Sequence, residues 1–294
     1  MKKAVVFGYG NVGKAVINAL NDTKDLKLAG IVSRSCAGRT VDGVPVVADD
    51  KELGAYDVAI LALPSREVPA KAAELLGRGI PTADSFDIHG EIPALRKSLD
   101  ATAKKGGAAA VISAGWDPGS DSVIRTMMLA MAPRGISYTN FGPGMSMGHS
   151  VAVKAIDGVK DSLSMTIPMG QGIHRRMVYI ELEDGADFEA VAKAIKADAY
   201  FVHDETHVQA VPSVRALKDM GHGVHLERKG VSGAANNQCF SFDMKIDNPA
   251  LTGQILVCAA RAALRSQPGC YTMIEIPTVD FLEMDRDEAV KLLV

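Results

Sequence analysis

The first twenty residues constrain the fold most, because a strand pattern changes there into a helix pattern across closely spaced glycines. Residues 4–7 form an apolar run typical of a buried strand, and apolar side chains return with helical spacing from residue 12. The glycines between follow the G-x-G-x-x-G pattern, which permits a tight turn, close approach of a pyrophosphate and close helix packing. The helix N-terminus then offers N–H groups to phosphates. The alternative is a tight turn without a ligand, but we predict a nucleotide site. Its predicted contacts are Gly8, Tyr9, Gly10, Asn11, Val12 and Gly13.

The end of the second expected strand, residues 26–32, indicates which dinucleotide is bound. A site for NAD places Asp or Glu about 20 residues after the glycines, where it binds the ribose 2′-hydroxyl. Here Ser33, Arg34 and Ser35 stand in that place. A guanidinium can bind a 2′-phosphate through two hydrogen bonds, whereas a carboxylate would repel it. We therefore predict NADP as the cofactor, the alternative being an ordinary polar loop.

Composition excludes several other classes of protein. The 294 residues carry a formal net charge of −3 and are 47% hydrophobic, as in a globular protein of one or two domains with no expected nucleic-acid or membrane partner. No apolar run reaches the roughly 18 residues that span a bilayer. The four cysteines show no ligand spacing, and the chain enters a strand at once. We expect free thiols, a cytoplasmic location and no signal peptide.

Apolar strands alternate with helices up to residue 118, which predicts a Rossmann-type, doubly wound α/β fold with a parallel sheet covered on both faces. The later strands are expected at 58–63, 80–84 and 108–113, and the helices between them at 67–79 and 92–105. Ligands bind such sheets at the carboxyl ends of the strands. Further cofactor contacts are therefore expected in the strand-end loops, from Leu63, Pro64, Ser65, Ser85, Phe86, Ala114, Gly115 and Pro118.

Beyond residue 118 the pattern becomes that of an α+β domain on a mostly antiparallel sheet. We predict a dinucleotide-binding domain at 1–118, a substrate-binding domain at 119–248, and a C-terminal segment, 249–294, that packs back near the first domain. The expected helices are 122–132, 188–197 and 249–265, and the expected strands are 136–141, 163–167, 177–182, 207–211, 224–228 and 239–246.

Charged residues at the strand ends are the candidates for chemistry. Asp87 and Asp117, the latter next to Trp116, follow strands that should end near the nicotinamide, and carboxylates there can bind an ammonium or transfer protons. Alternatively, Asp117 begins a turn and Asp87 caps a helix. Arg176, at the expected start of a strand, suits a carboxylate, although a solvated strand end is the simpler interpretation.

Neither a metal site nor a catalytic nucleophile is predicted. The pairs His203 with His207 and His222 with His225 have ligand-like spacings, but no H-E-x-x-H pattern accompanies them and neither pair lies in an expected helix. Ser113 is followed by Ala-Gly, which does not form a nucleophile elbow.

Several longer motifs resemble those of meso-diaminopimelate dehydrogenase. The resemblance covers nearly the whole chain, and the third and fourth of its motifs are far more specific than the glycine turn. The motifs are G-Y-G-N-V-G at 8–13, D-S-F-D-I-H at 84–89, S-A-G-W-D-P-G at 113–119 and N-F-G-P-G-M-S-M-G-H-S at 140–150. The chain is most similar to the shorter members, since longer members have Trp and Gln at the positions of Phe141 and Met147 and extra residues before the strand at Arg176.

The resemblance implies reversible, NADP-dependent oxidative deamination of the D-configured centre of meso-2,6-diaminopimelate to L-2-amino-6-oxopimelate, ammonia and NADPH. It implies that Asp87, Trp116 and Asp117 meet the reacting centre. The general base stays open between Asp87, Asp117 and a water. It also implies that the second domain forms a homodimer, with larger assemblies possible. The residues implied to hold the distal, L-configured end are Thr166, Arg176, His222 and Asn248, and those implied to line the same pocket are Phe141, Met147 and Gly148.

Two alternatives to this function are kept. The first is another enzyme of the same broad nicotinamide group: either an NADP-dependent dehydrogenase of simpler D-amino acids or a dihydrodipicolinate-reductase-like enzyme. A non-catalytic NADP sensor is the alternative of another class, but such a sensor should have lost its polar pocket residues. Those residues are all present, namely Asp87, Asp117, Arg176, His222 and Asn248.

Overall fold

The computed structural model describes residues 1–217 and 221–294. The chain forms two compact units, one of Met1–Thr126 with Pro249–Val294, the other of Met127–Asn248. The division falls inside helix α4 (Ser120–Met131), eight residues beyond the predicted limit at residue 118. The predicted limit lies in the turn between β7 and α4, whereas no break in secondary structure marks the observed division, because α4 is one continuous helix.

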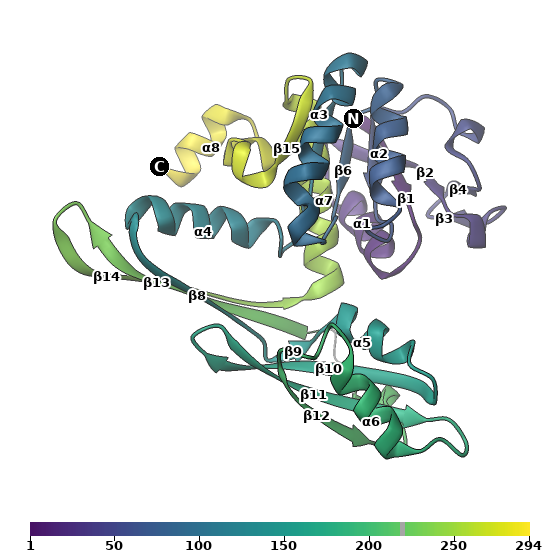
Figure 1. Cartoon of the computed structure of the whole chain (residues 1–294). Coiled ribbons are helices and arrows are strands. Elements are labelled where there is room, and N and C mark those ends of the chain that lie inside the picture. The colour runs from purple at the N-terminus through teal and green to yellow at the C-terminus, as the bar shows by residue number, and fades with distance from the viewer. Residues whose placement is uncertain (218–220) are drawn as a thin grey trace. The chain divides into compact units, whose positions relative to one another are not determined.

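The first unit is built on an eight-stranded sheet in the order β15-β7-β6-β5-β1-β2-β4-β3. Its pairings are parallel except for β3 with β4, as predicted for a doubly wound fold. Figure 1 shows this sheet with helices on both faces. The strands are β1 (Lys2–Phe7), β2 (Leu26–Val32), β3 (Thr40–Val41), β4 (Val44–Val47), β5 (Val58–Leu61), β6 (Thr82–Asp84), β7 (Ala109–Ile112) and β15 (Gly269–Thr272).

Two apolar clusters form the core of this unit, one on each face of the sheet. Helices α1 (Asn11–Asp22) and α7 (Asn248–Arg265) pack with the alternate β1 residues Ala4 and Val6. Helices α2 (Val68–Gly77) and α3 (Ile92–Gly106) pack with Val5 and Phe7 on the other face. Both faces are covered because side chains alternate along a strand, which explains why the strands read as continuous apolar runs. The last helix is α8 (Arg286–Leu293).

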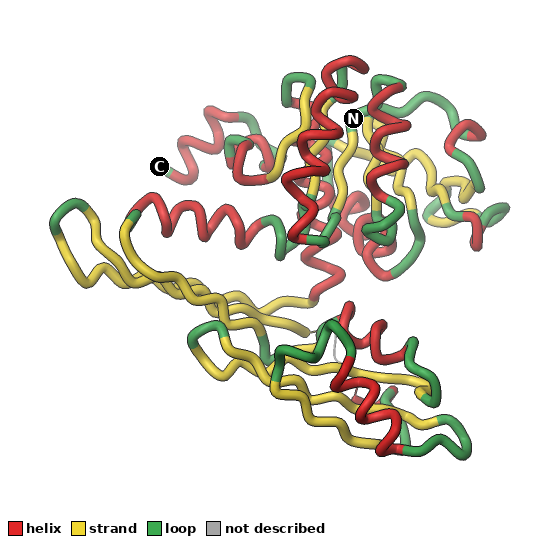
Figure 2. Tube along the Cα trace, in the orientation of Figure 1, coloured by secondary structure: helices red, strands yellow, loops and turns green. Residues whose placement is uncertain are grey.

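The second unit holds two sheets rather than one. The four-stranded sheet has the order β12-β11-β10-β9, and its apolar face is covered by α5 (Met147–Lys154) and α6 (Phe188–Ala197). The other sheet is an antiparallel three-stranded one, β14-β13-β8. Figure 2 shows its long strands in yellow. The strands are β8 (Arg134–Phe141), β9 (Gly144–Met145), β10 (Val159–Gly170), β11 (Ile173–Leu182), β12 (Glu205–Ala210), β13 (Gly221–Ser232) and β14 (Ala235–Asp247).

Several local predictions were wrong. Between the strands expected at 136–141 and 163–167 no helix was predicted, but Met147–Lys154 form α5, whose Gly and Ser residues hid its helical pattern. Arg176 lies inside β11 rather than at its start, since the strand begins at Ile173. The short strands β3, β4 and β15 were not predicted. Among residues 1–217 and 221–294, no helix combines the length and apolar character that a membrane crossing requires.

Candidate active site

The glycine turn after β1 leaves room only for backbone. Gly8 has a φ of +99°, and a Cβ there would lie 2.2 Å from the Ala62 carbonyl oxygen. A Cβ on Gly13 would lie 2.2 Å from the Gly8 carbonyl oxygen. Gly10, by contrast, faces open space at the start of α1, whose first turn has neither a capping side chain nor an acidic residue. The backbone N–H groups in the first turn of α1 are therefore available to an anion, and the turn fits the pyrophosphate of a dinucleotide.

The loop after β2 exposes the side chains predicted to bind a 2′-phosphate. The Ser33 and Ser35 hydroxyl oxygens lie 3.3 Å apart. The Arg34 side chain is 84% exposed, and its Nη2 is 3.6 Å from Glu67 Oε2. Because this ion pair is solvated, it competes only weakly with a phosphate.

Asp84, which was not predicted, ties together the loops that follow β6 and β7. Its Oδ1 accepts hydrogen bonds from the backbone N–H groups of Phe86, at 3.0 Å, and Ser113, at 3.1 Å. Its backbone oxygen accepts from Ala114 N at 2.7 Å. Burial raises the pKa of this carboxyl to about 6, although both N–H groups act in the opposite direction. The sequence signal that could have identified Asp84 is its position, since it is an acidic residue at the end of an apolar strand.

Asp87 is exposed and joined to another predicted site residue. Its Oδ1 accepts from the Ser65 hydroxyl at 2.6 Å, while its own N–H donates to Ser65 Oγ at 3.2 Å. This pair links the loops after β5 and β6. The alternative role of Asp87 as a helix cap is not realised, because the next helical turn begins at His89 with Ile88 before it.

The loop after β7 buries Trp116, which is 7% exposed, and presents Asp117 to an arginine. The Arg125 Nη2 donates to Asp117 Oδ1 at 2.9 Å and to Asp121 Oδ2 at 2.5 Å. The predicted turn is also present, since Gly115 N donates to the Pro118 carbonyl at 2.9 Å. Asp117 thus belongs to a cluster of two carboxylates and one guanidinium, which we call the acidic cluster (Asp117, Asp121, Arg125).

In the second unit, Arg176 lies in a different setting. Thr166 on β10 is paired in register with Arg176 on β11, and the Arg176 Nη1 donates to the Thr166 hydroxyl. The Arg176 Nε donates to Asp204 Oδ2 at 2.6 Å, and the arginine side chain is only 13% exposed. We call this group the paired-arginine cluster (Thr166, Arg176, Asp204). Sequence reasoning missed Asp204, which precedes β12 and carries no motif.

The Arg176 charge acts on two histidines of the second unit. Burial, and secondarily the Arg176 charge, lowers the pKa of His149 to about 4. The same two causes lower the pKa of His174, whose Nε2 accepts from Phe141 N at 2.8 Å. Both shifts favour the neutral form of these histidines, whereas Arg176 keeps its positive charge.

The remaining substrate contacts predicted from the sequence lie on segments of the second unit, and strand pairing brings several of these segments together. Gly144 pairs with Thr166, and a Cβ on Gly144 would lie 2.5 Å from the His222 Cα. Asn248 follows the β14 residues that pair with β13 at Gly221 and His222. The second unit thus brings Thr166, His222 and the start of α7 to one region, whereas Met147 and Gly148 form the first turn of α5.

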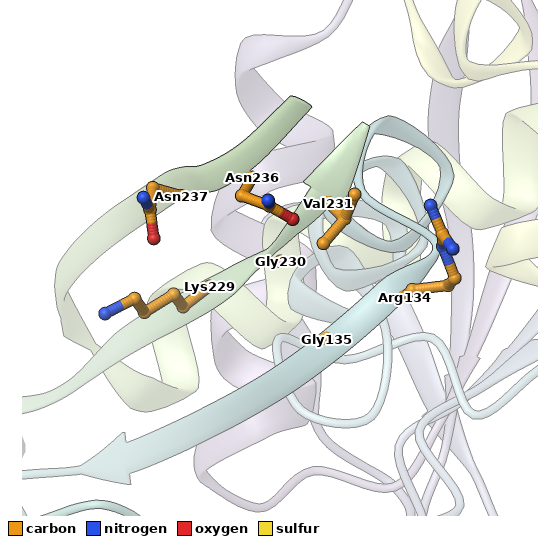
Figure 3. Close-up of a pocket in the computed structure, with 7 residues that line it drawn as sticks. All are labelled: Arg134, Gly135, Lys229, Gly230, Val231, Asn236 and Asn237. Carbon is orange, nitrogen blue, oxygen red and sulfur yellow. The ribbon is translucent and has the colours of Figure 1, made fainter. Parts of the chain in front are cut away.

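An open pocket of about 550 Å³ lies elsewhere in the second unit, at the end of the three-stranded sheet where β8 begins and β13 turns into β14 (Figure 3). None of the predicted site residues lines it. Its lining residues are Arg134, Gly135, Lys229, Gly230, Val231, Asn236 and Asn237.

The histidines considered as metal ligands have other neighbours. His207 contacts Glu205 at 2.7 Å, and His225 contacts Asp243 at 2.7 Å. In the part of the chain that the structure describes, no three His, Cys, Asp or Glu side chains are grouped to hold a metal ion.

The doubly wound sheet and the open glycine turn at the carboxyl ends of its strands define a nucleotide-binding protein of the Rossmann type. Residues 115–175 match the diaminopimelic acid dehydrogenase C-terminal domain, and residues 1–86 match a CoA binding domain. The meso-diaminopimelate D-dehydrogenase of Bacteroides fragilis is 62% identical over the full length of both chains. The enzyme of Lysinibacillus sphaericus is 32% identical over 92% of this chain and 93% of its own. The chain belongs to the meso-diaminopimelate D-dehydrogenase family.

Solved structures agree with this assignment. The Corynebacterium glutamicum diaminopimelate dehydrogenase in complex with diaminopimelate has a TM-score of 0.90 at 28% identity, covering 100% of this chain and 99% of its own. An engineered D-amino acid dehydrogenase bound to NADP⁺ has a TM-score of 0.84 at 26% identity, with the same coverage. The predicted family and fold are thus confirmed.

Proposed function

We propose that the chain catalyses the reversible, NADP-dependent oxidative deamination of the D-centre of meso-2,6-diaminopimelate, giving L-2-amino-6-oxopimelate, ammonia and NADPH for lysine and diaminopimelate biosynthesis. One observation carries the proposal: in a single unit, Asp87 and Asp117 follow the neighbouring parallel strands β6 and β7, at the same edge of the sheet as the open glycine turn after β1. The 62% identical relative supports the same reaction.

The first unit supplies the cofactor site and the reacting end. The glycine turn binds the pyrophosphate, and Ser33, Arg34 and Ser35 bind the 2′-phosphate. When bound, NADP⁺ accepts the hydride from the D-configured carbon. Asp87 and Asp117 hold the ammonium on that carbon, and the buried Trp116 ring limits access of water beside it. Orientation and fixed charge then lower the barrier.

The second unit holds the distal end of the substrate. Arg176, kept in place by Thr166 and Asp204, offers a guanidinium to the distal carboxylate. His222 and Asn248 bind the remaining polar groups, and Phe141, Met147 and Gly148 line the aliphatic part. Because the substrate has two carboxylates and two ammonium groups, its site needs both signs of charge.

The direct test uses purified protein with NADP⁺ or NAD⁺ and a panel of diaminopimelate isomers and D-amino acids. NADPH formation from the meso isomer, read by absorbance, is the expected result. Cofactor reduction that is no faster than in a substrate-free control would exclude the proposed reaction.

A second candidate is a broader action on D-amino acids. It is favoured by the apolar side chains of Phe141 and Met147, which leave the aliphatic part of the pocket without extra hydrogen-bonding groups. In the same panel, NADPH formation from D-alanine or D-lysine at a rate comparable to the meso isomer would establish this scope.

We also propose that the second unit forms a homodimer in the cytoplasm. The dimer is supported by exposed apolar side chains on α4 and β8. The cytoplasmic location is supported by the cysteines, which are free rather than joined in disulfides. Light scattering after chromatography measures the mass, and Ile136→Glu should shift it toward the monomer. The apolar side chains are Met127, Leu129, Met131 and Ile136.

A further inference from the structure

The first turns of α4 carry an acid and an arginine that both belong to the acidic cluster. Asp121 and Arg125 lie one helical turn apart, and the arginine Nη2 reaches Asp121 Oδ2 at 2.5 Å and Asp117 Oδ1 at 2.9 Å. The Asp121 side chain has no exposed surface, and that of Asp117 is 10% exposed. The backbone N–H of Asp121 also donates to the Trp116 carbonyl at 3.1 Å. Asp121 is therefore connected to the loop after β7 through its backbone N–H and, by way of Arg125, through its side chain.

Charge balance within the acidic cluster limits its ionisation. Two buried carboxylates that share one guanidinium do not readily both ionise, because the second negative charge is desolvated and repelled by the first. Burial, followed by the Asp117 charge, raises the pKa of Asp121 to about 8, while Arg125 acts in the opposite direction. Helix α7, which approaches this loop, presents the uncharged Thr252 at 3.8 Å from a Cβ on Gly115. The charged groups that face Asp121 are thus Asp117 and Arg125.

We propose that Asp121 and Arg125 are positioning residues that act through Asp117. Arg125 fixes the carboxylate that receives the reacting ammonium, and Asp121 keeps one proton in the cluster until this ammonium binds. The substrate cation favours two ionised carboxylates, so its binding expels the proton to solvent. The inference rests on the proposed function, since it requires an ammonium at Asp117.

Proton release on binding can be counted without turnover. The protein saturated with NADPH cannot oxidise meso-diaminopimelate, so titration calorimetry in buffers of different ionisation enthalpy measures only binding and its linked protons. At pH 7 we expect wild type to release close to one more proton per site than Asp121→Asn, because the asparagine cannot hold the extra proton. Glu74→Gln, which alters a half-exposed ion pair with Lys71 and Arg78, is the matched control and should release as many protons as wild type.

The wild-type protein alone provides a second measurement, should Asp121→Asn fail to fold. If binding expels one proton, the Kd for meso-diaminopimelate falls up to tenfold per pH unit from pH 6 toward 8 and then levels off. A Kd that does not change across this range would overturn the proposal, as would equal proton release by wild type and a folded Asp121→Asn.

Kinetics test the role of the arginine. Arg125→Met should lower kcat/KM about tenfold to a hundredfold, leave the KM for NADP⁺ unchanged, and be partly rescued by Arg125→Lys, which keeps a charge. Unchanged kcat/KM in Arg125→Met would remove Arg125 from this role. A wild-type protein that forms no NADPH from the meso isomer would instead contradict the proposed function, so the two failures are distinguishable.

Discussion

The acidic cluster and the paired-arginine cluster are built from the same kinds of group but differ in charge. In the first unit, one guanidinium lies between Asp117 and Asp121, so carboxylates outnumber arginines. In the second unit, Arg176 lies between one carboxylate and a hydroxyl, and its charge favours the neutral form of two histidines. The acidic cluster therefore favours the binding of cations. The paired-arginine cluster contains the Arg176 guanidinium, which can bind an anion.

The largest expected effect concerns stereochemistry. If the acidic cluster binds the reacting ammonium and the paired-arginine cluster binds only the distal carboxylate, the L,L isomer places the wrong hydrogen toward the cofactor. Unpaired polar groups then cost about 10⁴-fold or more in kcat/KM relative to the meso isomer. Initial rates of NADPH formation from isomerically pure compounds measure this ratio. Comparable rates from both isomers would mean that the clusters do not distinguish the ends.

Removal of Arg176 should separate the two clusters by substrate. D-Lysine is diaminopimelate without the distal carboxylate, so Arg176→Ala should reduce kcat/KM for diaminopimelate about tenfold to a hundredfold more than for D-lysine. Arg175→Ala is the matched control, because Arg175 pairs with Glu205 on the next strand. Equal losses for both substrates would assign Arg176 a structural role only.

Arg34 extends the comparison, because its side chain is exposed, unlike that of Arg176. Arg34→Asp replaces a phosphate-binding group by a repelling one and should weaken NADP⁺ binding roughly tenfold, and up to a hundredfold, while favouring NAD⁺ relatively. Fluorescence titration with both cofactors measures the change. Identical affinities for NADP⁺ in wild type and variant would exclude Arg34 from the cofactor site.

The smallest expected effect is on stability, and its dependence on pH has opposite signs for Asp121 in the acidic cluster and for His149, whose pKa is lowered by burial and by the Arg176 charge. Folded Asp121 keeps its proton up to about pH 8, but the unfolded chain loses it near the ordinary value of 3.8, so the free energy of unfolding falls as pH rises between them. The slope is at most about 1.4 kcal/mol per pH unit. Folded His149 stays neutral down to about pH 4, whereas the unfolded chain binds a proton below about 6.5, so this contribution rises with pH from 4 to 6.5.

Thermal unfolding of two variants checks these signs. Relative to wild type, the Tm of Asp121→Asn should rise as pH increases from 5 to 8, since the variant lacks the proton-binding group. The Tm of His149→Gln, again relative to wild type, should fall from pH 4.5 to 6.5. Parallel slopes for the two variants would contradict the assigned protonation states.

Sequence reasoning predicted the doubly wound sheet and its glycine turn, because these depend on local patterns at residues 4–20. It did not find Asp121 and Arg125, since their approach to Asp117 depends on where α4 begins and how the preceding turn closes. Asp204 was missed for a similar reason: its partner is 28 residues away on another strand. Tertiary partners of this kind leave no spacing that a sequence pattern can record.

The first unit is interrupted in sequence, with consequences for how the chain is made. Strand β15 completes the edge beside β7, and Gly253 brings α7 so near α1 that a Cβ would lie 2.6 Å from the Ala15 carbonyl carbon. Residues 127–248 separate these pieces from the first 126 residues. At about 5–20 residues per second, a ribosome takes roughly 6–24 s to make that insertion. During this time the part of α1 that packs against α7, at Ala15 and Val16, lacks this partner. The uninterrupted second unit can fold meanwhile, so the part of the protein that is synthesised first is completed last.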